Sequence, residues 1–144
     1  MGFLLKGEIN LKIAEDFKDL CKKLYDYFHP IYGYLFSAKY EGTDEFNPTE
    51  EQIKDLNLRH IHRLNFFSPV FVDKLGKKKL LGIPELVNGL TTEHDEDYLE
   101  FGEPLPVCSV EELSDGGILL SLSKNPSSIN YDKQEMIAKE LGFG

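Results

Sequence analysis

The chain is poor in the residues that mark several common classes of protein. It has two cysteines among its 144 residues, Cys21 and Cys108, which is too few for a disulfide scaffold and favours reduced thiols. No apolar run approaches the roughly 20 residues needed to cross a bilayer. The segment Met1–Leu11 lacks the apolar core and small-residue cleavage site of a signal peptide. We therefore expect a cytoplasmic protein that does not engage a membrane.

Positive charge is also scarce. Sixteen Lys and Arg residues stand against 25 Asp and Glu residues, which gives a formal net charge of −9. Binding to phosphates needs a concentrated basic surface, so this balance argues against a nucleic-acid partner. It favours a soluble protein that repels copies of itself, or one that meets a basic partner.

Catalytic signatures are missing as well. The chain has no G-x-S-x-G segment, and Gly116-Gly117 lacks the glycine spacing that cradles phosphate. His60 and His62 are the most suggestive pair, because on a strand both imidazoles would project from one face and could share a metal. No third ligand has a suitable spacing, and Arg59 and Arg63 flank the pair. We expect two half-exposed histidines and neither a metal nor a cofactor.

The residues that are present suffice for one core. Hydrophobic residues make up 41% of the chain, a usual value for a soluble globular protein, and the length predicts a single domain over residues 1–144. Alternation predicts a strand at Phe3–Leu11, and an apolar stripe predicts a helix at Ile13–Phe28 that ends before Pro30. Aromatic residues predict a strand at Ile31–Tyr40. The stripe comprises Ile13, Phe17, Leu20, Cys21, Leu24 and Phe28, and the strand would place Tyr32, Tyr34, Phe36, Ala38 and Tyr40 on one face.

The second half of the chain predicts further short elements. Asn47 is expected to cap a helix, and Ser68-Pro69 opens another that turns Val70, Phe71 and Leu75 inward. A strand is expected within Arg59–Phe67, a hairpin at Val107–Leu113 and Ile118–Leu122, and a final helix at Asn130–Leu141, while Leu80–Leu90 is ambiguous. The fold class that these elements predict is α+β, an antiparallel sheet with helices packed mainly on one face.

The densest charge lies in Thr91–Glu103, which carries six acidic residues and no basic one. A calcium loop needs oxygen ligands at alternating positions and a central glycine, and this segment breaks that order. One interpretation is a solvated loop. The other is an acidic docking surface, because dense negative charge speeds the encounter with a basic partner. The candidate partner-binding residues are Glu93, Asp95, Glu96, Asp97, Glu100 and Glu103.

Two segments carry a recognisable pattern. Asn65–Gly76 reads N-F-F-S-P-V-F-V-D-K-L-G, and Val110–Leu120 reads V-E-E-L-S-D-G-G-I-L-L. In this order they resemble segments of a group of small bacterial proteins, some of which are similar to immunity proteins encoded beside secreted polymorphic toxins. Many of these relatives carry tryptophan where Arg63 or Leu64 stands here. The resemblance implies a binding role and supplies no catalytic residue.

Three functions follow as expectations. The favoured one is a non-enzymatic binding protein, an immunity protein that neutralises a bacterial toxin through an acidic surface and whose partner is a basic toxin domain. One alternative is a small metal-dependent hydrolase that uses His60, His62 and a carboxylate. The other is a structural domain that forms a homodimer through its aromatic strand.

Overall fold

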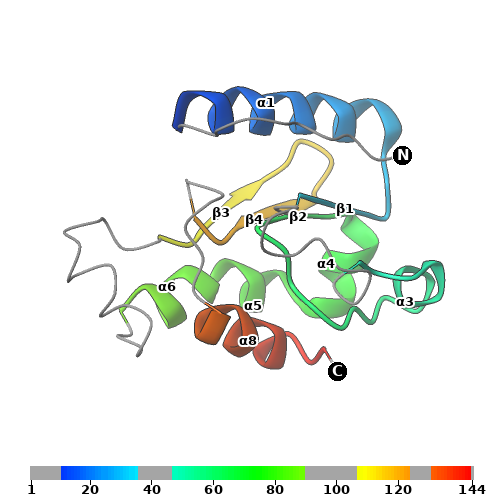
Figure 1. Ribbon diagram of the computed structural model, residues 1–144. Helices are drawn as coiled ribbons and strands as arrows, with labels where there is room; N and C mark the ends of the chain where they lie inside the picture. Colours follow the sequence, from blue (N-terminus) through cyan, green and yellow to red (C-terminus); the bar gives the residue numbers. More distant parts are fainter. Residues whose placement is uncertain (1–10, 36–46, 90–106, 124–130, 144) are drawn as a thin grey trace.

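The chain forms a four-stranded antiparallel sheet with helices on both faces (Figure 1). The computed structural model describes residues 11–35, 47–89, 107–123 and 131–143. None of the helices in these ranges has the length and apolar character needed to cross a bilayer. In chain order the elements are α1 (Leu11–Phe28), β1 (Tyr32–Leu35), α3 (Glu50–Lys54), β2 (Leu64–Phe67), α4 (Pro69–Leu75), α5 (Lys77–Leu81), α6 (Ile83–Asn88), β3 (Ser109–Glu112), β4 (Ile118–Ser121) and α8 (Tyr131–Glu140).

The strands lie in the order β1-β2-β4-β3, so the hairpin strand β4 separates β2 from β3. In the central strand, Asn65 lies opposite Tyr34 of β1 and Leu120 of β4. Successive side chains of a strand point to opposite faces. The register therefore places Asn65 and Phe67 on one face of the sheet, and Phe66 on the other.

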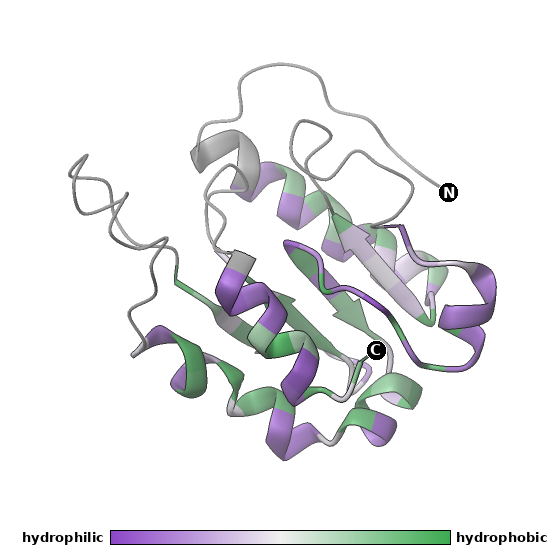
Figure 2. Ribbon diagram, turned by 60° about the horizontal axis from the view of Figure 1, so that its bottom comes forward, coloured by the Kyte–Doolittle hydropathy of each residue, from purple (hydrophilic) through white to green (hydrophobic). Residues whose placement is uncertain are grey.

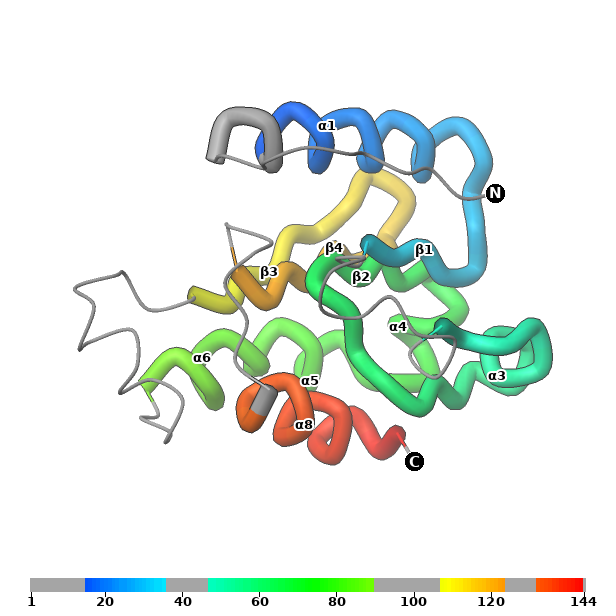
Figure 3. Tube along the Cα trace, viewed as in Figure 1, coloured from blue at the N-terminus to red at the C-terminus, as the bar shows by residue number. Residues whose placement is uncertain are grey.

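Helices cover the two faces unequally. Of the helices that the structure describes, Figure 1 shows α1 across one face, while Figure 3 shows α4, α5 and α6 following one another across the opposite face with α8 alongside. The larger core lies on the side of the shorter helices. It includes the buried residues Phe67, Phe71, Leu80, Ile83, Val87, Ile118, Leu120 and Ile137. A smaller buried cluster lies beneath α1 and consists of Tyr25, Leu64, Phe66 and Leu119.

Local signals explain where the helices begin and end. α1 stops two residues before Pro30, since the residue that precedes a proline avoids the helical region. The expected cap of α3 was Asn47, but the N-cap is Thr49, whose hydroxyl accepts a hydrogen bond from the N–H of Gln52 at 3.1 Å. The Gln52 side chain accepts in return from the N–H of Thr49, which completes a capping box. In Figure 2 the helices carry both hydrophilic and hydrophobic residues, as expected of helices with one buried side.

The hairpin between β3 and β4 depends on its two glycines. Gly116 has φ of +92°, a conformation that side-chain-bearing residues rarely adopt, and it closes a three-residue loop. The N–H of Leu113 donates to the carbonyl oxygen of Gly117 at 2.8 Å, which sets the register of the two strands. A Cβ at Gly117 would lie 2.5 Å from the hydroxyl oxygen of Tyr25 and 2.6 Å from the carbonyl oxygen of Phe67. The loop therefore has no room for a larger residue there.

The predicted fold class is confirmed, and the structure refines several elements. The hairpin and the final helix lie where the sequence places them, and the ambiguous segment forms the end of α5 and all of α6. Of the strand expected within Arg59–Phe67, only Leu64–Phe67 forms. Leu11 is the first residue of α1, whereas the rest of the first predicted strand lies outside the described residues. Most helices do lie on one face, but the longest lies on the other, which the sequence did not predict.

The side of α1 that packs on the sheet differs from the apolar stripe that the sequence predicts. Tyr25, which the stripe omits, is its most buried described residue, while Leu20 and Phe28 of the stripe are exposed. At 3.6 residues per turn, Leu20 lies about 140° around the helix axis from Tyr25. The side chain that faces the sheet is thus offset from the centre of the stripe, and part of the apolar surface of α1 remains in solvent.

Candidate functional site

The two histidines that the sequence singles out have different surroundings. Both precede β2 in a segment that is not a strand. His60 is half-buried, whereas His62 is 1% exposed, so the expectation of two half-exposed imidazoles on one strand is wrong for His62. The Nδ1 atom of His62 lies 2.9 Å from the hydroxyl oxygen of Tyr32. The pair does not form the shared face that a metal site would need.

Asn65 organises a buried polar network around His62. Its Oδ1 accepts hydrogen bonds from the Tyr32 hydroxyl at 2.6 Å and from the backbone N–H of His62 at 2.8 Å. Its Nδ2 donates to the carbonyl oxygens of His62 at 2.7 Å and Leu120 at 3.2 Å. All four hydrogen-bonding positions of the amide are therefore used.

The same network assigns the tautomer of His62. A tyrosine hydroxyl has one hydrogen, and that of Tyr32 goes to Asn65. The contact between Tyr32 and His62 then requires Nδ1 of the imidazole to be the donor. On α8, Nε2 of Gln134 donates to the carbonyl oxygen of Ile61 and attaches this segment to the helical layer. Through these bonds the segment that contains His62 connects the sheet to the helix α8, so His62 has a structural role.

The described residues offer no metal centre. Within 11–35, 47–89, 107–123 and 131–143, no three His, Cys, Asp or Glu side chains lie together as metal ligands. Cys21 and Cys108 are free thiols, the first half-buried and the second buried. The acidic candidates of the sequence lie outside the described residues, and they are Glu93, Asp95, Glu96, Asp97, Glu100 and Glu103.

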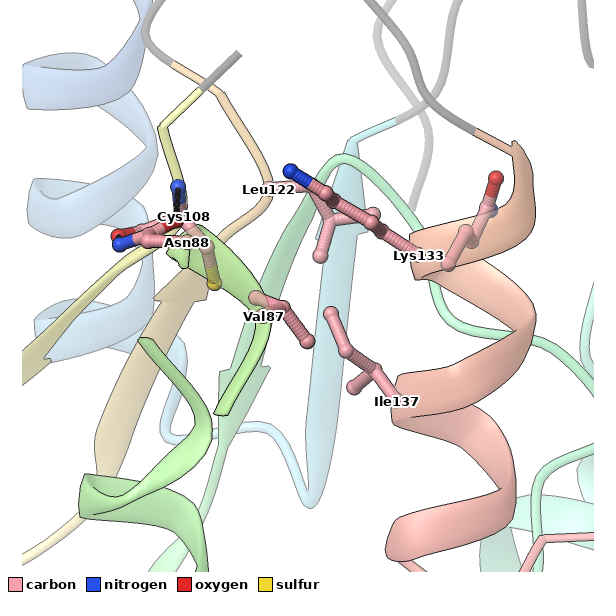
Figure 4. Close-up of a pocket in the computed structure, with 7 residues that line it drawn as sticks. Val87, Asn88, Cys108, Leu122, Lys133 and Ile137 are labelled. Carbon is pink, nitrogen blue, oxygen red and sulfur yellow. Dashed lines mark hydrogen bonds between the residues drawn. The ribbon is translucent and has the colours of Figure 1, made fainter. Parts of the chain in front are cut away.

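A small cavity lies between α6, α8 and the residues that flank β3 and β4 (Figure 4). Its volume is about 20 Å³, which is enough for a water molecule and too small for an organic substrate. Burial raises the pKa of the Cys108 thiol to about 12, and the opposing influence of the Lys133 charge is smaller. A protonated thiol is a poor nucleophile, so the cavity is not a nucleophilic site. Its lining residues are Val87, Asn88, Cys108, Leu122, Lys133, Gln134 and Ile137.

A different kind of site lies where α1 meets the β3–β4 hairpin. The hydroxyl of Tyr25 donates to Oδ2 of Asp115 at 2.8 Å, and the N–H of Gly117 donates to Oδ1 of the same carboxylate at 2.8 Å. One turn earlier on α1, Lys22 forms an ion pair of 2.7 Å with Glu111 of β3. We call the Tyr25–Asp115 hydrogen bond and the Lys22–Glu111 ion pair the α1 clasp. They explain why the side of α1 that carries Tyr25 faces the sheet, and why the centre of the apolar stripe does not.

Acidic groups surround the clasp. The pKa of Lys22 is raised, first by its hydrogen bond to Glu111 and then by the charges of Glu111, Asp19 and Asp26. Burial raises the pKa of the Tyr25 hydroxyl, and its hydrogen bond to Asp115 and the charges of Asp115 and Asp26 act in the same direction. The charge contributions to both shifts come from carboxylates, and Asp26 contributes to each of them.

Apolar side chains are exposed at the end of α1 next to this acidic region. Tyr27 is 79% exposed, Phe28 51% and Ile31 47%, and the rings of Tyr27 and Phe28 pack edge to face with centroids 4.9 Å apart. The N–H of Ser68 donates to the carbonyl oxygen of Ile31 at 3.1 Å, which brings the start of α4 to the same place. Val70, two residues later, is 57% exposed. We call Tyr27, Phe28, Ile31 and Val70 the apolar end.

Sequence reasoning missed the apolar end for an identifiable reason. It assigned Phe28 to the buried stripe of α1 and Val70 to the buried side of α4, but both are exposed, and α4 buries Val72 with Phe71 and Leu75 instead. Periodicity shows which residues share a side of a helix, but the clasp decides which side meets the sheet. The sequence did contain a signal. Large apolar residues are concentrated just before and after Pro30, and the end of a single helix cannot bury all of them.

Comparison with known proteins adds no identification. Protein-family models, curated proteins and solved structures give no match to this chain. The function has to be argued from the residues themselves.

Proposed function

We propose that this chain is a non-enzymatic protein-binding protein, an immunity protein that neutralises a bacterial toxin by binding it through an acidic surface. The observation that carries the proposal is the excess of acid, 25 acidic against 16 basic residues. It extends to the region of the α1 clasp, where Asp19 and Asp26 act on Lys22 together with its partner Glu111. An acidic surface accelerates association with a basic protein and disfavours acidic competitors.

The chemistry of the described residues supports binding rather than catalysis. His62 is committed to Tyr32 and Asn65 in the core, and Cys108 is a buried thiol of raised pKa. The cavity beside Cys108 holds a water molecule at most. By contrast, large apolar side chains are exposed at the apolar end, which is a feature of protein-binding surfaces.

Co-expression tests the proposal. The gene next to this one is expected to encode a secreted protein with a C-terminal toxin domain, and this chain should restore the growth of cells that express that domain. The purified pair should also associate more slowly when the acids of Thr91–Glu103 are reversed to lysine, because long-range attraction would be lost. A pair reversal, Glu96→Lys/Asp97→Lys, has as its matched control the reversal of the exposed Glu135 and Glu140 of α8, which changes the net charge equally.

Two results would contradict the proposal. A toxin domain that stays lethal in the presence of this chain, with no complex on size-exclusion chromatography, would rule out the immunity role. Stoichiometric zinc or manganese in the purified protein, lost on replacing His60, would favour the hydrolase instead. An association rate at low salt that is indifferent to the reversals would remove the 93–103 segment from the binding surface.

A further inference from the structure

Two short stretches of chain build the apolar end. Tyr27 and Phe28 close α1, Ile31 follows Pro30, and Val70 lies in the first turn of α4. The hydrogen bond from Ser68 to Ile31 joins the residue that precedes α4 to the segment that follows α1. In Figure 1 the C-terminal end of α1 and α4 lie at the same end of the sheet, on opposite faces. Tyr27 and Phe28 therefore form one exposed aromatic pair, and Ile31 and Val70 are exposed on the two segments that this hydrogen bond joins.

This surface is not needed to complete the core. On α4, the neighbouring Phe71 and Val72 are buried while Val70 is exposed. On α1, Tyr25 is buried against Phe66, with ring centroids 5.5 Å apart, while Tyr27 points away. Aromatic pairs that stay in solvent beside a complete core are typical anchors of protein interfaces, since they bury large area at low entropic cost.

Acidic residues border the apolar end. Asp26 immediately precedes Tyr27, and Asp73 follows Val70 by one turn of α4; both carboxylates are exposed. The hairpin loop reaches the same region, because the Cβ position of Gly116 lies 4.0 Å from Cγ of Pro69, and Asp115 is the preceding residue. Lys74 on α4 donates to the carbonyl oxygen of Asp55 at 2.9 Å and is directed toward α3. Lys23 is exposed one turn before Tyr27, so the border carries three carboxylates, those of Asp26, Asp73 and Asp115, against the two ammonium groups of Lys23 and Lys74.

We propose that the apolar end is a docking surface for a cationic amphipathic segment of a protein partner. The apolar anchors of that segment would cover Tyr27 and Phe28, and its Lys or Arg side chains would face Asp26, Asp73 and Asp115. A second copy of this chain is disfavoured as the occupant, because each copy has a net charge of −9 and would bring the same carboxylates together. This proposal rests on the proposed function and names the part of the molecule that performs it.

The test uses the 144-residue chain and synthetic peptides. The probe is a fluorescein-labelled 18-residue helix of leucine and lysine in an amphipathic pattern, and its counterparts replace lysine by glutamate or leucine by serine. Fluorescence anisotropy should show binding of the leucine–lysine peptide alone. The double variant Tyr27→Ala/Phe28→Ala should weaken that binding about tenfold or more, as expected for loss of two interface anchors.

Matched variants separate the apolar and the electrostatic parts. Leu81→Ala/Leu86→Ala removes two other exposed apolar side chains, on α5 and α6, and should leave the affinity unchanged. Asp26→Lys should weaken binding about threefold to tenfold at low salt, and the difference should shrink at 0.5 M salt because exposed charges are screened. All the substituted residues are exposed, so unchanged thermal unfolding should confirm that the variants fold.

Several outcomes would overturn this inference. One is equal binding of the lysine and glutamate peptides, and another is no loss on Tyr27→Ala/Phe28→Ala. A dimer that disappears in the same variant would show that the surface binds a second copy of the chain. Binding to phosphatidylcholine–phosphatidylglycerol vesicles that depends on Tyr27 would show that the surface binds a membrane. If no peptide binds while the chain still protects cells from the toxin domain, this surface is excluded and the immunity role stands.

Discussion

The two faces of the sheet are closed in different ways. On the face of the shorter helices, Phe67 and Phe71 belong to a large, continuous cluster of buried apolar residues. On the face of α1, the buried cluster is small, and polar contacts of Tyr25 and Lys22 with the hairpin supplement it. Burial of apolar area is the main source of stability, so the first face stabilises the fold. The second face holds a helix that leaves apolar side chains exposed, Leu20, Tyr27 and Phe28 among them.

Adjacent residues of α4 give the strongest test of this contrast. Phe71→Ala should lower the free energy of unfolding by about 3–5 kcal/mol, since it leaves a cavity at a fully buried position of the larger cluster. Val70→Ala should change it by less than about 0.5 kcal/mol, because Val70 is exposed. Urea unfolding followed by circular dichroism measures both. Equal losses would show that Val70 belongs to the core.

The two thiols report the local stability of each face. Cys21 lies at the small cluster under α1 and Cys108 belongs to the large one. Since only a small cluster and polar contacts hold α1, we expect it to detach before the rest unfolds, and a thiol reagent at pH 8 should label Cys21 at least about 100-fold faster than Cys108. Cys21→Ser should remove the fast phase and leave the slow one. Similar rates at both positions would mean that the two faces open together.

Gly117→Ala tests the contact between α1 and the hairpin. The added methyl group would meet the Tyr25 hydroxyl and the fixed carbonyl oxygen of Phe67, and we expect a loss of about 2–3 kcal/mol. The matched control is Gly89→Ala, where no atom lies within 4 Å of the new Cβ and φ is −83°, so no loss is expected. Thermal unfolding compares the two variants. A neutral Gly117→Ala would indicate that Tyr25 moves away without cost.

Much of the architecture follows from the sequence because it depends on local patterns. Proline, glycine and periodicity located the C-terminal end of α1, both ends of α4, the hairpin and α8, while α1 begins at Leu11, which the sequence had assigned to a strand. The pattern did not reveal the burial of His62, because that depends on Tyr32 and Asn65, which meet it only in the folded sheet. The sequence also did not predict which side of α1 packs on the sheet, because Tyr25 is held there by a hydrogen bond to Asp115, 90 residues away in the chain. Both the burial of His62 and the orientation of α1 depend on polar partners that are distant in the chain, and a single sequence does not show which distant residues meet.

Tyr25→Phe removes the hydrogen bond of the clasp to Asp115. We expect a loss of about 1–2 kcal/mol near neutral pH, as for a hydrogen bond to a charged acceptor. The pKa of Tyr25 is raised above its ordinary value of 10, so its stabilising contribution is complete below pH 10 and declines as the pH rises above it. Unfolding measured from pH 7 to 11 should therefore show a steeper decline in the parent than in Tyr25→Phe. Parallel curves would mean that the folded state does not depend on this hydroxyl.

Successive residues of β3 provide the smallest and most selective comparison. Glu111 pairs with Lys22 of α1 at 2.7 Å, and Glu112 pairs with Lys77 of α5 at 2.6 Å, so similar ion pairs lie on opposite faces of one strand. Exposed pairs contribute about 0–1 kcal/mol, and either glutamate-to-alanine change should cost that little. Glu111→Ala should nevertheless speed the labelling of Cys21, by up to about fivefold, because it weakens the attachment of α1, whereas Glu112→Ala should not. If both variants speed it equally, the helix is held by the hairpin as a whole rather than by its own clasp.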